Sequence, residues 1–250
     1  MTSVGVIPAR YEASRFMGKV LADIGGKPMI QHVWERAKRA RLLDDLIIAA
    51  DDDRIIKAVE AFGGKVVFTA KAHPSGTDRL KEIVNPLDVD IVVNIQADEP
   101  LLRPSMIDTL VSALSEDEEI VMASLMKKIT DPEAVKDPNV VKVVVDKNSF
   151  ALYFSRSPIP FTRDAYAMAA TYYKHIGLYA YTKDFLFSFT KIPVSSLEKR
   201  EKLEQLRALE NGYKIKMVDT KYDTIGVDTV GDLERVKRKL GIVERTIQEL

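Results

Sequence analysis

The stretch that decides the fold is Ser3-Val4-Gly5-Val6-Ile7-Pro8-Ala9-Arg10, an apolar run that stops at a proline and continues into a basic loop. Small and cationic residues follow as far as Lys27, and a helix opens at Pro28, where the missing backbone N–H costs nothing. A buried strand, a basic loop and a helix in this order suit phosphate groups. The spacing matches neither standard phosphate-binding glycine motif, so a solvated surface loop stays an equal alternative on spacing alone.

Outward from this stretch, strands and helices alternate over the first half of the chain. Apolar runs predict strands over 46–50, 65–69 and 89–95, and helical spacing predicts helices over 29–37 and 54–62. This alternation is typical of a doubly wound α/β fold with a mostly parallel sheet, in which ligands bind beyond the carboxyl ends of the strands. The basic loop follows such an end, which favours the phosphate-binding interpretation.

The pattern changes from about residue 130, where short β-branched runs predict a smaller antiparallel insertion. Further along we expect a strand over 174–181, one amphipathic helix over 196–209, a strand over 214–218 and a helix over 230–240. The last two elements return to the main sheet. We therefore predict one α/β domain made of residues 1–129 and 212–250, with an inserted region over 130–211.

Asp98 is the sharpest chemical signal in the sequence. It follows the predicted strand over 89–95, where a carboxylate is well placed to hold Mg²⁺ against a nucleotide phosphate. The alternative is that Asp98 caps the next helix. That alternative is weaker, because the helix after Pro104 has its own proline start.

Other acidic residues have plainer explanations. The run Asp51-Asp52-Asp53 is better explained by Asp52 or Asp53 capping the following helix than by a metal site. On spacing alone, Asp228 is the N-cap of the helix over 230–240.

Several segments resemble, in family order, motifs of the 3-deoxy-manno-octulosonate (KDO) cytidylyltransferases, the CMP-KDO synthetases of Gram-negative bacteria. The matching segments are Pro8-Ala9-Arg10 with Ser14-Arg15 and Gly18-Lys19, His73-Pro74-Ser75-Gly76-Thr77-Asp78-Arg79, Asn94-Ile95-Gln96-Ala97-Asp98-Glu99-Pro100, Lys174-His175-Ile176-Gly177-Leu178-Tyr179, Glu204-Gln205-Leu206-Arg207 and Gly226-Val227-Asp228-Thr229. The chain departs from the family at Ala97, where glycine is usual. Alanine would be strained there if the backbone φ is positive.

This resemblance implies a Rossmann-like nucleotide-diphospho-sugar transferase fold. It implies an enzyme that transfers CMP from CTP to the 2-hydroxyl of KDO and releases pyrophosphate, for lipopolysaccharide biosynthesis. Asp98 and Asp228 would hold Mg²⁺, and Lys19 would be the third catalytic residue. The residues implied to bind CTP are Pro8, Ala9, Arg10, Arg15, Lys19, Ser75, Gly76 and Gln96. The residues implied to bind the sugar acid are Arg156, His175, Tyr179, Glu204 and Gln205. The inserted region would bind the sugar and form a homodimer.

Composition narrows the function classes further. Lys plus Arg and Asp plus Glu balance at 37 each, which argues against a general nucleic-acid or membrane-surface binder. There is no cysteine, so a disulfide framework and a thiolate zinc site are excluded. No apolar run approaches a membrane span and the N-terminus predicts a strand, so we expect a cytoplasmic protein. Two rivals stay open: a cytidylyltransferase for another sugar acid, such as 8-amino-KDO or neuraminate, and a non-catalytic sensor of CTP or a nucleotide sugar.

Overall fold

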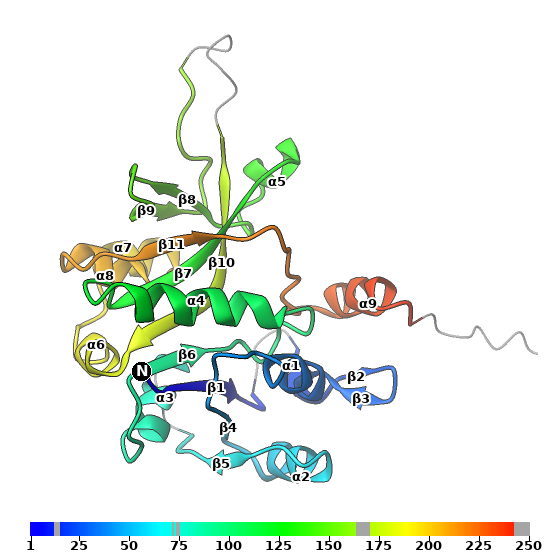
Figure 1. The fold of residues 1–250 in the computed structure, drawn as a ribbon. Coiled ribbons are helices and arrows are strands. Elements are labelled where there is room, and N and C mark those ends of the chain that lie inside the picture. Colours follow the sequence, from blue (N-terminus) through cyan, green and yellow to red (C-terminus); the bar gives the residue numbers. More distant parts are fainter. Residues whose placement is uncertain (13–15, 72, 74–75, 164–170, 243–250) are drawn as a thin grey trace, which may run out of the picture.

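A nine-stranded sheet with helices on both faces forms the body of the protein (Figure 1). The structure, a computed structural model, describes residues 1–12, 16–71, 73, 76–163 and 171–242. Seven strands follow one path across the sheet, in the order β11 (Lys216–Asp219), β7 (Met122–Lys128), β10 (Tyr173–Thr182), β6 (Ile91–Asn94), β1 (Ser3–Ala9), β4 (Asp45–Ala50) and β5 (Val66–Phe68). The strands β8 (Lys142–Val145) and β9 (Ala151–Ser155) extend it beside β10.

The sheet is mostly parallel, as the sequence predicts. β1 runs parallel to both β6 and β4, with Gly5 opposite Val93 on one side and Leu46 on the other. β10 is antiparallel to β6 and β7, and also to β8. Because β1 lies between two strands and under helices on both faces, its run of apolar residues is almost wholly buried.

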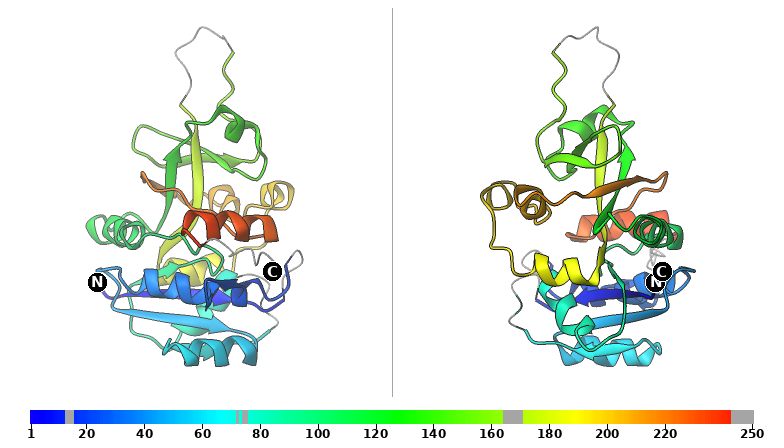
Figure 2. Two further views of the ribbon diagram at one scale, coloured as in Figure 1. Left: turned by 90° about the vertical axis from the view of Figure 1, so that its right-hand side faces the viewer. Right: turned by 60° about the vertical axis from the view of Figure 1, so that its left-hand side comes forward.

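Two apolar clusters cover the two faces of the sheet. One face packs against α1 (Met29–Ala37), α2 (Asp53–Ala61) and α4 (Pro104–Glu116). The other packs against α3 (Gly76–Val84), α6 (Lys183–Phe189) and α8 (Leu206–Glu210). Helices on both faces of a parallel sheet confirm the doubly wound class, and two views of the molecule show the layers (Figure 2).

A third, smaller cluster attaches the end of the chain to the first loop. Leu233 and Val236 of α9 (Val230–Lys239) pack with Ile24 of the hairpin β2 (Asp23–Ile24) and β3 (Lys27–Pro28). This packing brings the segment before α9 close to the loop after β1. The fold thus joins two parts of the chain that carry predicted site residues.

The inserted region is not separate from the main sheet. β10 lies within residues 130–211 and yet pairs with β6 over Tyr179–Thr182 and with β7 over most of its length. The short helix α5 (Pro132–Lys136) and the hairpin β8–β9 lie beyond it, on the side of the molecule away from β5 (Figure 1). The predicted division at residues 130 and 211 stays a prediction, with β10 shared between the two parts.

The single helix predicted over 196–209 is wrong. The structure has two helices, α7 (Ser196–Glu201) and α8, separated by Lys202 in the left-handed conformation at φ 55°. The break is fixed from outside, because Glu201 accepts hydrogen bonds from Ser155 Oγ and the Arg156 backbone N–H. The periodicity of the sequence cannot show these hydrogen bonds, because their donors lie about 45 positions away in the chain.

Two acidic residues were predicted to cap helices, and the structure confirms one of these predictions and contradicts the other. Asp52 is the N-cap of α2 and accepts a hydrogen bond from the Arg54 backbone N–H, which confirms that prediction. At α9 the N-cap is Thr229, which forms a reciprocal capping box with Asp232. The prediction that Asp228 caps this helix is therefore wrong. Among the described residues, no helix is long and apolar enough to cross a membrane.

Candidate active site

Lys19 joins two acidic side chains that lie far from it in the sequence. Its ammonium donates hydrogen bonds to Asp98 Oδ2 at 2.6 Å and to Asp228 Oδ1 at 2.9 Å. Lys19 begins η1, a 3-10 helix over Lys19–Leu21 in the loop after β1. Asp98 follows β6, and Asp228 directly precedes the N-cap of α9. The structure therefore brings the three predicted catalytic residues into one cluster, which we call the Lys19 cluster.

Charge pairing dominates this cluster. Burial alone would lower the pKa of the Lys19 ammonium, but Asp98 and Asp228 outweigh it and raise the pKa above its usual value. Two carboxylates that converge on one ammonium also converge on one position for a cation. Carboxylate oxygens are the ligands that Mg²⁺ takes, so the donor set fits the predicted metal ion.

The protein offers few ligands for such an ion. Within the described part of the chain, no group of three or more His, Cys, Asp or Glu side chains is arranged to hold a metal. A Mg²⁺ ion here would draw two ligands from Asp98 and Asp228 and the rest from water and substrate phosphates. That arrangement is the usual one for Mg²⁺ in nucleotide-dependent sites.

The first of two cavities at the cluster contains most of the residues predicted to bind CTP. It has a volume of about 290 Å³ and lies at the carboxyl ends of β1 and β6. Its lining residues are Pro8, Arg10, Glu12, Lys19, Val20, Gly76, Gln96, Ala97 and Asp98. Arg10 is oriented by a 2.9 Å hydrogen bond from Nη2 to the His73 carbonyl. Five of the predicted CTP-binding residues therefore face one cavity: Pro8, Arg10, Lys19, Gly76 and Gln96.

Of the three remaining predicted CTP residues, the structure describes one, Ala9, and it does not line this cavity. Ala9 is fully buried in the apolar cluster on the α1 side of the sheet, so its side chain packs in the core. Arg15 and Ser75 lie outside the described residues. Ala97 lines the cavity and is not strained, because Ser149 and Lys202 are the only non-glycine residues with positive φ in the described ranges.

A second cavity, of about 580 Å³, lies on the other side of the Lys19 cluster. Asp228 lines it together with Glu99, Lys174, His175 and Gly177. Asp98 and Lys19 line the first cavity and Asp228 lines the second, so the ion pairs of Lys19 lie between the two. Two substrates, one in each cavity, would meet at this cluster.

His175 is held in one tautomer at the wall of the second cavity. Its Nε2 lies 3.0 Å from Ser124 Oγ, and that hydroxyl also lies within hydrogen-bond distance of the Ile176 and Leu178 carbonyls. A hydroxyl has one proton, and the carbonyls can only accept it, so His175 Nε2 donates to Ser124 Oγ. Burial, with a smaller effect from Lys174, lowers the pKa of His175 to about 3. His175 is therefore a neutral hydrogen-bonding group.

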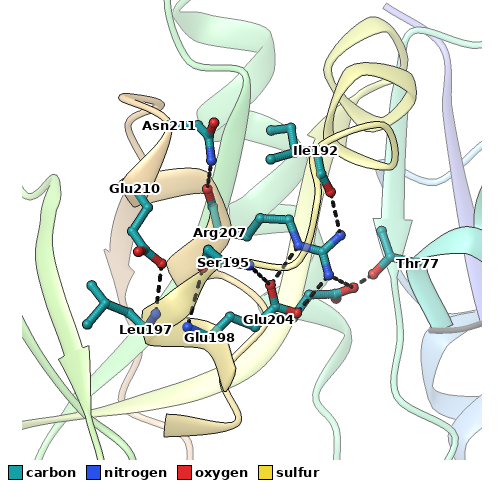
Figure 3. Close-up of polar contacts among 9 residues, drawn as sticks. All are labelled: Thr77, Ile192, Ser195, Leu197, Glu198, Glu204, Arg207, Glu210 and Asn211. Atoms are coloured by element: carbon teal, nitrogen blue, oxygen red, sulfur yellow. Dashed lines mark hydrogen bonds and ion pairs between the residues drawn. The ribbon is translucent and has the colours of Figure 1, made fainter. Parts of the chain in front are cut away.

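The other predicted sugar-acid residues lie near one another but line neither cavity. The Tyr179 ring packs against His175, and desolvation raises the pKa of its hydroxyl well above the usual value. Glu204 Oε2 accepts a 2.7 Å hydrogen bond from Thr77 Oγ1, so the break between α7 and α8 directs it toward the start of α3 (Figure 3). Gln205 is buried, and its Nε2 has no hydrogen-bond partner in the part of the chain that the structure describes.

Arg156 is engaged elsewhere. Its Nε donates to the Glu201 carbonyl at 2.7 Å and its Nη1 to the Pro138 carbonyl at 2.9 Å. These bonds attach the residue after β9 to the end of α7 and to the loop at Pro138. In this structure the guanidinium has a structural role, and its predicted contact with the sugar acid stays a prediction.

Glu99 is a residue of the site that the sequence reasoning missed. It lines the second cavity, and burial, followed by the neighbouring charge of Asp98, raises its pKa to about 7. Its Oε2 has no hydrogen-bond partner among the described residues. Its place directly after Asp98 was the available signal, but the sequence does not show that its side chain is buried.

The fold and the two cavities fit a nucleotidyltransferase: cations predicted to bind phosphate follow the first strand, and two converging carboxylates lie between two cavities. The family model described as "Cytidylyltransferase" matches residues 4–215. The chain is 50% identical over 249 residues to the 3-deoxy-manno-octulosonate cytidylyltransferase of Geobacter sulfurreducens, covering 96% of this chain and 100% of the relative. It is 54% identical over 239 residues to the enzyme of the same name from Syntrophobacter fumaroxidans, covering 94% and 96%.

A solved structure agrees with these relatives. A CMP:2-keto-3-deoxy-manno-octonic acid synthetase complexed with CTP superposes with a TM-score of 0.91 at 45% identity, covering 96% of this chain and 99% of that one. The chain belongs to the 3-deoxy-manno-octulosonate cytidylyltransferase family. A cytidylyltransferase from Leptospira borgpetersenii, with a TM-score of 0.65 at 15% identity over 97% of this chain and 88% of that one, shares the fold.

Proposed function

We propose that this protein transfers CMP from CTP to the 2-hydroxyl of KDO, giving CMP-KDO and pyrophosphate. The observation that carries the proposal is the position of the Lys19 cluster between two cavities. The first cavity has cations for a triphosphate, and the second has polar groups for a hydroxylated acid. The names of the relatives and the CTP bound in the solved neighbour support the choice of substrates.

The reaction joins the two cavities at one phosphorus atom. The 2-hydroxyl oxygen of the sugar acid attacks the α-phosphorus, the bond to the β-phosphate breaks, and the hydroxyl proton is lost to solvent. Arg10 and Lys19 neutralise the triphosphate and stabilise the charge that collects on the departing pyrophosphate. Mg²⁺, when bound by Asp98 and Asp228, supplies further positive charge at the reacting phosphate.

The sugar acid is held by groups that hydrogen-bond without changing charge. Neutral His175, whose Nε2–H is taken by Ser124, accepts a hydrogen bond through Nδ1 at the wall of the second cavity, and the nearby Glu204 and Gln205 supply an acceptor and a donor. In this proposal residues 130–211 supply the sugar-binding contacts and the surface of a homodimer, and 1–129 with 212–250 bind the nucleotide. The enzyme acts in the cytoplasm, in lipopolysaccharide biosynthesis.

The first experiment is pyrophosphate release from CTP with Mg²⁺ and, in separate reactions, KDO, 8-amino-KDO and N-acetylneuraminate. We expect release with KDO. Release with 8-amino-KDO alone would keep the chemistry and overturn the substrate. Tight CTP binding with no release from any sugar would favour the nucleotide sensor. Omitting the metal tests the assignment of Mg²⁺, and sedimentation velocity of the same sample tests the homodimer.

A further inference from the structure

The two cations of the first cavity, Arg10 and Lys19, flank a loop whose ends are tied together. Arg10 directly precedes Tyr11, and Lys19 directly follows Gly18. The Gly18 backbone N–H donates a 2.8 Å hydrogen bond to the Tyr11 carbonyl. This bond closes the loop at its base and sets how far apart the two cations lie on the wall of the cavity.

At the Gly18 end of this hydrogen bond, the backbone conformation and the close Tyr11 ring both require glycine. Its φ is +68°, which L side chains rarely adopt. A Cβ added there would lie 3.1–3.2 Å from the hydroxyl end of the Tyr11 ring, tighter than normal packing. The ring thus rests directly on the backbone that begins η1 and orients Lys19.

Tyr11 is itself anchored to the acidic turn after β4. Its backbone N–H donates a 3.1 Å hydrogen bond to Asp51 Oδ1. The Arg54 guanidinium lies over its ring, 3.3 Å from the centroid. Stacking of a guanidinium on an aromatic face is favourable and fixes the plane of the ring.

Each anchor forms a further ion pair, one buried and one exposed. Asp51 Oδ2 accepts a 3.0 Å bond from Arg79, whose side chain is fully buried. Arg54 forms two 2.8 Å bonds with the two carboxylate oxygens of Asp52. Asp51 therefore supports the Tyr11 backbone from the core side, and Asp52, the N-cap of α2, holds Arg54 over the exposed face of the ring.

We propose that Tyr11 is a positioning residue that sets the spacing of Arg10 and Lys19 on the nucleotide cavity, with Asp51 and Arg54 as its anchors. Tyr11 does not line that cavity, so it acts through the two cations and not by touching the nucleotide. The inference rests on the proposed function, because it treats the triphosphate of CTP as the group that the cations bind.

The test compares Tyr11→Ala with Tyr11→Phe, measuring the dissociation constant of CTP with Mg²⁺ by calorimetry in the full-length protein. Phenylalanine keeps the ring under Arg54 and against Gly18, and alanine removes it. We expect Tyr11→Ala to weaken CTP binding about tenfold and Tyr11→Phe to stay within about twofold. In turnover, KM for CTP should rise with Tyr11→Ala while KM for the sugar acid is unchanged.

A matched pair isolates the anchor. Arg54→Gln removes the cation over Tyr11, and Lys38→Gln removes the cation that lies 4.5 Å over the Trp34 ring, away from both cavities. Arg54→Gln should weaken CTP binding about threefold and Lys38→Gln should leave it unchanged. Equal effects of the two variants would contradict the inference.

The inference and the proposed function fail in different ways. A wild-type protein that binds CTP but releases no pyrophosphate contradicts the function and leaves the comparison of dissociation constants valid. A Tyr11→Ala protein that binds CTP as tightly as wild type contradicts the inference even in an active enzyme. Loss of affinity for CTP and sugar acid together, with no rescue by phenylalanine, would show a general structural role and overturn it.

Discussion

Two ion-pair clusters in this protein, each with one cation and its carboxylate partners, differ in how firmly the cation is held. In the Lys19 cluster, one ammonium bonds to two carboxylates, and the Asp228 side chain is 46% exposed. In the second, which we call the Arg207 cluster, the guanidinium forms two parallel 2.7 Å bonds with Glu198 and a 3.1 Å bond with the Ile192 carbonyl (Figure 3). Arg207 and Glu198 are 9% and 12% exposed.

The difference teaches what each cluster is suited to. An ammonium is a point charge that a divalent ion or a phosphate can replace or attract, whereas a guanidinium in a bidentate pair is fixed in one geometry. The Lys19 cluster is therefore suited to exchanging partners during a reaction. The Arg207 cluster is suited to holding α7 against α8, which determines where Glu204 lies.

The largest effect is expected in the Lys19 cluster. Asp98→Asn keeps the shape of the side chain but removes one of the two converging charges, so a metal ion loses one of its two anionic ligands. Pyrophosphate release should fall by more than about 10³-fold. The CTP dissociation constant should change by less than about tenfold, or 1.4 kcal/mol. Asp53→Asn, an acid in the first turn of α2, is the matched control; an active Asp98→Asn protein would disprove the metal role.

The next effect tests whether the Arg207 cluster is structural. Arg207→Lys keeps the positive charge but cannot form two parallel bonds with Glu198. Urea denaturation should show a loss of about 2–3 kcal/mol in the free energy of unfolding. Lys136→Met breaks an exposed pair with Glu133 and should change stability by less than about 0.5 kcal/mol. Similar losses in both variants would remove the distinction between fixed and exposed pairs.

His175 extends the comparison to a buried group that is neutral. Its pKa in the folded protein is about 3, below the value of about 6.5 in an unfolded chain, so between these values the unfolded state binds more protons. The stabilisation is complete above about pH 6.5 and is lost as pH falls toward 3. Going from pH 7 to 5 should lower the free energy of unfolding by about 2 kcal/mol from this residue.

The measurement is urea denaturation at both pH values for wild type, His175→Asn and His32→Asn. The His175→Asn protein should lack this part of the pH dependence, and His32→Asn, on α1, should retain it. An unchanged pH dependence in His175→Asn would mean that other groups produce it.

The smallest expected effect tests whether the Lys19 ammonium and a divalent ion compete for the same two carboxylates. Lys19→Met leaves Asp98 and Asp228 convergent without the ammonium, so they should bind a divalent ion more tightly. Electron paramagnetic resonance of Mn²⁺ in the absence of nucleotide should show affinity about tenfold higher than in wild type. Lys65→Met, which breaks the pair with Asp45 at the start of β4, should leave Mn²⁺ binding unchanged. Unchanged binding in Lys19→Met would mean that the ammonium and the metal do not compete.

Much of the fold could be predicted because local pattern determines it. The apolar run of β1, its proline end and the strand before Asp98 are all visible in sequence. The position of β10 could not be predicted, because an antiparallel strand between two others depends on pairings with residues distant in sequence. The break at Lys202 was equally invisible, since Ser155 and Arg156 impose it from another strand.

The candidate site divides in the same way. The sequence motifs indicated Asp98, Asp228 and Lys19 separately, but Lys19 is 79 and 209 positions from its partners in the sequence, which conceals their contact. Spacing misassigned Asp228 as a helix cap because the observed N-cap, Thr229, is the next residue. Arg156 shows the opposite case, in which a residue type suited to a carboxylate is used to bind backbone carbonyls.

The pairing of β10 with β7 contains a bulge, and Gly177 in that bulge lines the second cavity. The pairing with β7 passes from Ile176 opposite Leu125 directly to Tyr179 opposite Ser124, so Gly177 and Leu178 have no counterparts. Two is an even number, and side chains alternate along a strand, so every residue before and after the bulge keeps its face. A chain without this residue pair would form the same sheet and lose part of the cavity wall. Insertion or deletion of a residue pair at this bulge should therefore alter the cavity wall without moving the flanking side chains to the opposite face of the sheet.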